Sequence, residues 1–115
     1  MRYKRVLLGV TLVAAVVACD DVMGGSGDIT VGGGGFVFSP STLTLTTKRP
    51  VKFVWGSGPH NVTWEDMATG SGDKSGGEYT RDFTSAAGGD YRFRCTIHST
   101  SFTVGMVGRI TVPAP

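Results

Sequence analysis

The sequence predicts an all-β fold, either an antiparallel sandwich or a barrel of short strands. From residue 36 onward, apolar and β-branched residues alternate with polar ones in short runs, a period typical of strands that bury one face. Turn-forming Gly, Pro and Ser residues separate these runs. No segment after residue 36 keeps the 3.6-residue apolar repeat of an amphipathic helix. Short strands joined by turns indicate a sandwich or barrel.

The first expected strands lie between residues 29 and 45. Residues 29–31 are a candidate short strand inside a glycine-rich stretch. The run 36–38 is apolar and ends at a Ser39-Pro40 break, and Leu43 and Leu45 then alternate with threonines. A Lys-Arg-Pro turn at residues 48–50 ends this part of the chain.

The remaining strands are expected at residues 51–55, 60–64, 79–83, 91–95 and 106–112. The run 51–55 is strongly β-prone. In the run 91–95 the alternation is clear, with arginines at the outer positions and Tyr91, Phe93 and Cys95 at the inner ones. Trp55 and Trp64 are expected in the core. The charged residues of the intervening loop and strand are expected on solvated loops or edges: Asp73, Lys74, Glu78 and Asp82.

Residues 1–18 have the pattern of an export signal. Arg2, Lys4 and Arg5 precede an apolar run at residues 6–17, which is shorter than the roughly 20 residues needed to span a bilayer. The run ends in Val-Val-Ala before Cys19 and resembles a bacterial lipobox. That resemblance implies that Cys19 becomes the first mature residue and carries a lipid. An ordinary cleaved signal and an uncleaved anchor are the alternatives.

The expected organisation is a signal peptide (1–18), an acylated Cys19 with a Gly-rich tether (19–35), and one domain (36–115). Gly-rich segments behave as flexible linkers. Removing residues 1–18 takes away three of eleven basic residues and no acidic ones, which moves the formal charge from +2 to about −1. The remaining part offers no basic patch of the kind that binds nucleic acid.

Cys95 is the second of two cysteines, so acylation of Cys19 leaves it without a disulfide partner. A lone thiol in an oxidising compartment stays reduced when it is deeply buried or when it binds a metal. Two histidines, His60 and His98, sit at strand ends, and Met106 follows eight residues after His98. One thiolate, two imidazoles and a weak thioether are the ligands of a copper electron-transfer site. Taken singly, each of these residues is more often a packed core or surface residue than a metal ligand.

Four segments together resemble the plastocyanin/pseudoazurin branch of the cupredoxins. They are Val51 to Trp55, Pro59-His60-Asn61-Val62, Gly89 to His98 with its Tyr-x-Phe-x-Cys-x-x-His pattern, and Gly105 to Val112 with its Gly-Met-x-Gly pattern. The resemblance implies a cupredoxin-like Greek-key β-sandwich that holds one type 1 copper at one end. It implies ligation by His60, Cys95, His98 and Met106. It also implies that the backbone N–H of Asn61 bonds the cysteine sulfur and that its side chain ties the ligand loops together.

One departure concerns the ligand loop. Seven residues, 99–105, separate His98 from Met106, where members of the family usually have two to four. Because added loop length costs little entropy, Met106 can still reach the copper. The alternative is that Met106 lies farther from the copper and leaves a nearly three-coordinate site.

The function implied is that of a blue-copper single-electron carrier, lipid-anchored on the periplasmic face of a bacterial membrane and monomeric. An exported copper chaperone or buffer with the same ligands is the alternative, and a metal-free adhesive sandwich is a third reading. No enzyme is expected, because the sequence has no Ser/His/Asp context and its Gly runs do not join a strand to a helix. Redox partners are expected to dock near His98 and Phe102. Encounter should depend only weakly on ionic strength, because loops 56–59 and 99–105 carry no charge.

Overall fold

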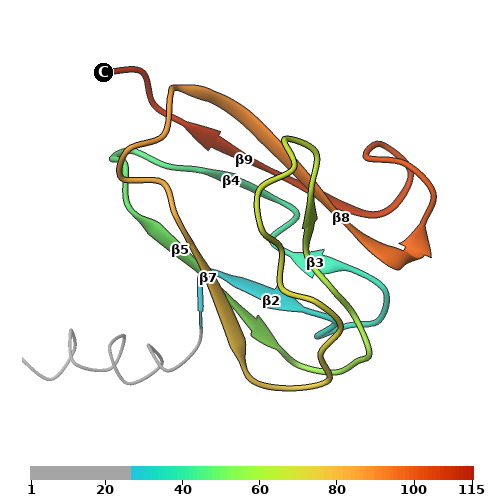
Figure 1. Ribbon diagram of the computed structural model, residues 1–115. Coiled ribbons are helices and arrows are strands. Elements are labelled where there is room, and N and C mark those ends of the chain that lie inside the picture. Colours follow the sequence, from blue (N-terminus) through green and yellow to red (C-terminus); the bar gives the residue numbers. More distant parts are fainter. Residues whose placement is uncertain (1–26) are drawn as a thin grey trace, which may run out of the picture.

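The computed structural model describes residues 27–115, which form two four-stranded sheets packed face to face (Figure 1). The first sheet has the order β3-β2-β5-β7 and the second β4-β9-β8-β6. The strands are β2 (Ile29–Val31), β3 (Phe38–Ser39), β4 (Thr42–Thr44), β5 (Pro50–Trp55), β6 (Thr63–Trp64), β7 (Glu78–Asp82), β8 (Gly89–Ser99) and β9 (Gly105–Val112). The all-β sandwich predicted from the sequence is therefore confirmed. No helix in the described part is long and apolar enough to cross a membrane.

The strand pairing is mixed rather than purely antiparallel. β8 and β9 form a long antiparallel hairpin, and β5 pairs antiparallel with β7. However, β2 runs parallel to β5, and β4 runs parallel to β9. Alternation reports which face of a strand is buried but not its direction, so the antiparallel expectation was wrong for these two pairs.

The position of β2 shows that the folded domain begins before residue 36. Ile29 and Val31 are fully buried, and they pair in register with Phe53 and Trp55 of β5. The candidate strand at residues 29–31 is thus confirmed, and the expected domain start at residue 36 is too late. Tether residues 27–35 contain a core strand and the turn after it. The predicted signal, Cys19 and the rest of the tether lie outside the described residues.

The core fills the space between the sheets and follows the predicted alternation. Phe93 and Cys95 of β8 are fully buried, whereas the neighbouring arginines lie on the outer face. The Phe93 ring meets Phe38 and Phe53 edge-on, with ring centroids 4.8 and 5.2 Å apart. Fully burying such a side chain contributes roughly 1.5–3 kcal/mol. This packing places Cys95 at the end of the core, where β8 leaves the sandwich interior.

Candidate metal centre

Cys95 enters the site because β8 stops pairing regularly just after Arg94. The β8–β9 register runs evenly from Gly89 to Arg94 and resumes only at Ser99, which pairs with Gly105. Four residues of β8, from Cys95 to His98, therefore lie opposite the single residue Met106 of β9. A bulge of this kind re-aims side chains and is common beside functional sites. It carries the thiol and His98 to one end of the sandwich.

His60 is held from the other side by the loop between β5 and β6. Its backbone exchanges two hydrogen bonds of 2.9 Å with Lys74, and the Trp55 indole N–H donates to its carbonyl at 3.2 Å. The imidazole packs against Gly32, whose φ of +75° favours glycine and where a Cβ would come within 2.6 Å of Nε2. These contacts orient the ring so that Nδ1 faces the cysteine.

The three strongest donors meet in a triangle. His60 Nδ1 lies 3.2 Å from His98 Nδ1, and the Cys95 sulfur lies 3.9 Å from the first nitrogen and 3.7 Å from the second. A point equidistant from these three atoms is about 2.1 Å from each, close to the bonds of about 2.0–2.1 Å to imidazole and about 2.3 Å to thiolate that zinc makes. The site therefore fits one metal ion, and two imidazoles with one thiolate in a plane are typical of copper electron-transfer sites.

The electrostatics of the site favour metal binding. Burial lowers the pKa of His60, and the neighbouring His98 lowers it further because two imidazolium ions would repel each other. A neutral imidazole keeps the lone pair that binds a metal. Cys95 is fully buried and is the free cysteine of the described residues, so its thiol is protected from solution oxidants.

Asn61 joins the two ligand loops, as the family resemblance implied. Its backbone N–H donates to the Cys95 sulfur at 3.4 Å. Its side-chain N–H donates to Thr96 and to Asp73, both at 2.9 Å, and its side-chain oxygen accepts from the Thr96 backbone N–H at 3.0 Å and from Thr63 at 2.9 Å. Asp73 is therefore more than the solvated charge expected from the sequence, because it anchors this network.

Met106 is buried and lies in the β9 position opposite the Cys95–His98 bulge. The long loop 99–105 closes on itself through the Ser99–Gly105 pair. At Gly105, with φ of +93°, a Cβ would come within 2.7 Å of the His98 carbonyl oxygen. The extra residues thus project outward, and Met106 keeps its place on β9 opposite the bulge of β8. Axial ligation by Met106 remains a prediction.

Two aromatic residues make contacts that the sequence did not predict. Phe36 stacks on the His98 imidazole with centroids 3.8 Å apart and planes 14° from parallel, although the Phe36 side chain is 66% exposed. The sequence offered no signal for this contact beyond an aromatic residue after a glycine run. Phe102 lies over the Arg94 guanidinium, whose central carbon is 5.1 Å from the ring centroid, and its part in docking near His98 remains a prediction. Phe102 therefore faces the outer side of β8.

A β-sandwich that gathers two histidine nitrogens and a buried thiolate at one end defines a copper protein of the cupredoxin class. The comparisons agree with this class. Residues 26–113 match the model of the copper binding proteins of the plastocyanin/azurin family. The chain belongs to this family, and copper is its cofactor.

Plastocyanins are among its relatives. It is 32% identical over 90 residues to the chloroplastic plastocyanin of Chlamydomonas reinhardtii, a match that covers 69% of this chain and 60% of the relative. It is 30% identical over 90 residues to plastocyanin A/B of Petroselinum crispum, covering 69% and 90% of the two chains. A purple cupredoxin from Nitrosopumilus maritimus has the same fold, with a TM-score of 0.59 and 22% identity over 74% of this chain and 97% of that one.

Proposed function

We propose that this protein is an exported, membrane-anchored carrier of single electrons. The observation that supports this most strongly is the preformed donor triangle, in which His60 and Cys95 are buried while His98 is partly exposed. When bound, copper supplies the couple between Cu(II) and Cu(I). A donor set held by the surrounding backbone can keep nearly the same positions in both states. His98 and the stacked Phe36 then form the edge at which electrons enter and leave.

The edge itself supports docking through modest apolar contact. Phe36, which stacks on the His98 ring, and its chain neighbour Val37 are exposed large apolar residues. They add apolar surface to the docking patch expected near His98 and Phe102. Weak redox complexes use small interfaces of this kind. A partner that docks at this edge alone should give electron-transfer rates that change little with ionic strength, because loops 56–59 and 99–105 carry no charge that could steer it.

Redox cycling tests the proposal against the alternative of a copper chaperone or buffer. The buried ligands and the Asn61 hydrogen bonds favour retention of the metal over its release. The experiment is repeated reduction and oxidation at an electrode, with copper counted before and after in the presence of a copper chelator. A carrier keeps its copper and its current over many cycles. Transfer of copper to the chelator within a few cycles would identify a chaperone or buffer instead.

The anchoring part of the proposal is supported by the lipobox-like run that ends at Cys19. A lipid on Cys19 would keep the copper domain at a membrane surface, where redox partners are concentrated. The test is fractionation of the native chain and of Cys19→Ala. The native protein should sediment with membranes and incorporate labelled fatty acid, and the variant should do neither. An unchanged distribution of the variant would overturn the anchor without touching the copper assignment.

A further inference from the structure

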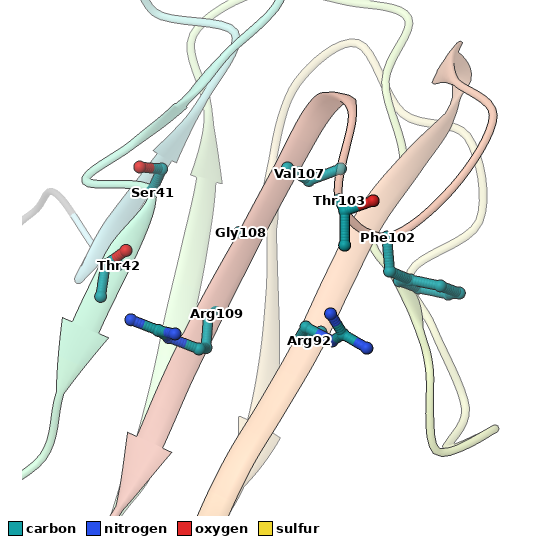
Figure 2. Close-up of a pocket in the computed structure, with 8 residues that line it drawn as sticks. All are labelled: Ser41, Thr42, Arg92, Phe102, Thr103, Val107, Gly108 and Arg109. Carbon is teal, nitrogen blue, oxygen red and sulfur yellow. The ribbon is translucent and has the colours of Figure 1, made fainter.

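A groove lies on the outer face of the second sheet, away from the core. It has a volume of about 320 Å³ and runs between β4, β9 and β8, beside loop 99–105 (Figure 2). Its lining is largely cationic and hydroxylic: Ser41, Thr42, Arg92, Phe102, Thr103, Val107, Gly108 and Arg109. The copper ligands take no part in this lining.

The charges on this face are unbalanced. Arg92 and Arg109 stand directly opposite each other on β8 and β9, a like-charged pair that disfavours the sheet. Glu65 makes a bidentate ion pair with Arg92, with contacts of 2.9 and 2.7 Å. Arg109 is exposed and makes no ion pair within residues 27–115. Arg94 adds a third positive charge beneath the Phe102 ring, and its buried Nε has no hydrogen-bond partner.

These groups suit a carboxylate ligand. A guanidinium binds a carboxylate through two parallel N–H donors, and the hydroxyls of Thr42 and Thr103 at the groove can add further bonds. The groove is a surface feature with exposed walls, where a single small anion would be screened by salt. Several linked carboxylates can occupy the groove and its rim together. We propose that this groove is a docking surface for an acidic segment of a partner protein.

The position of the groove gives such docking a route to the copper centre. Phe102 and Thr103, which line the groove, belong to the loop that joins His98 to Met106. Arg94 donates to the Ser99 carbonyl at 2.9 Å, and the Ser99 hydroxyl donates to the Cys95 carbonyl at 2.6 Å. A partner held in the groove therefore lies beside the backbone of β8, the strand that carries Cys95 and His98. This place differs from the edge formed by His98 and Phe36.

The test is a titration of the copper-loaded, reduced protein with hexaglutamate, followed by amide NMR shifts. We expect saturable shifts centred on Thr42, Thr103 and Arg109, and an affinity that falls steeply between low and physiological salt. Arg109→Gln should weaken binding about three- to tenfold, since a charge-assisted contact is lost. The matched control is Lys48→Gln in the β4–β5 turn, which removes a cation that likewise has no ion pair among residues 27–115 and should leave binding within about twofold.

Further titrations distinguish binding of an acidic peptide from binding of a free anion or of any charged peptide. Inorganic phosphate and hexalysine are titrated alongside, and the visible spectrum of each oxidised variant verifies that the copper centre is intact. Equal hexaglutamate affinity for Arg109→Gln and the wild-type protein would overturn the proposal, as would shifts that cluster away from the groove. Phosphate that binds the same amides more tightly than hexaglutamate would identify a free-oxyanion site and overturn docking of an acidic protein.

Discussion

Replacing Asn61 with alanine removes the side chain that links the loop of His60 to the strand of Cys95. Four hydrogen bonds disappear at once, two to Thr96 and one each to Asp73 and Thr63. A typical intramolecular hydrogen bond contributes about 0.5–1.5 kcal/mol, and water can partly replace these because the partners reach the surface. We therefore expect Asn61→Ala to lower the free energy of unfolding by about 2–4 kcal/mol.

Urea unfolding of the metal-free protein measures this effect without a contribution from copper binding. The control is Thr63→Val, which removes only one of the four bonds and should cost about 1 kcal/mol or less. A loss below about 1 kcal/mol for Asn61→Ala, or one equal to that of Thr63→Val, would refute the idea that this network holds the loops together.

Asn61→Ala should also change the properties of the copper site. The Asn61 backbone N–H donates to the Cys95 sulfur, and hydrogen bonds to this sulfur tune the reduction potential of such sites. Loosening the loop should shift the potential and the visible absorption of Asn61→Ala. Thr63→Val should keep both. An unchanged potential in Asn61→Ala would show that the backbone positions this donor without the side chain.

Three more substitutions test separate parts of the site. Met106→Leu should still bind copper and stay coloured, because a thioether is a weak ligand, but it should show a raised reduction potential, because losing a donor disfavours Cu(II); an unchanged potential and spectrum would mean that Met106 is not near the metal. Phe36→Leu should speed copper loss to a chelator severalfold and slow electron transfer, since the aromatic pair with His98 contributes about 0.5–1.5 kcal/mol; Val104→Ala, also at an exposed residue, is the control, and equal rates for both would contradict this role. Asp66→Asn should cost less than about 1 kcal/mol at neutral pH, since the ion pair is partly exposed. Hydrogen bonding to Arg81 lowers the pKa of Asp66, so this stability is present above the ordinary value of 3.8 and is lost as pH falls through the folded value. A difference between the two proteins that persists in strong acid would contradict the pair.

The sequence predicted what depends on local period and spacing. Alternation in β8 placed Phe93 and Cys95 inside and the arginines outside, as the structure confirms. The Cys-x-x-His spacing and the distant His60 were found because a metal site constrains residue types strongly. In the structure the possible ligand atoms of these three residues lie within 4.8 Å of one another.

What the sequence missed depends on contacts between segments far apart in the chain. The parallel pairings of β2 and β4 leave no trace in alternation. The stacking of Phe36 on His98 joins residues 62 positions apart, and no local pattern encodes it. The contact between Phe102 and Arg94 depends on the closure of loop 99–105, and no local pattern encodes it either.

The most direct test of the copper centre is the visible absorption of the oxidised protein together with its copper content, measured for the wild type and Cys95→Ser. The thiolate of Cys95 must supply the charge-transfer band, and serine cannot. We predict one copper per wild-type chain with intense colour, and a folded Cys95→Ser protein without that band. Full colour in Cys95→Ser, or a copper-loaded wild-type protein without an intense visible band, would contradict the assignment of this centre.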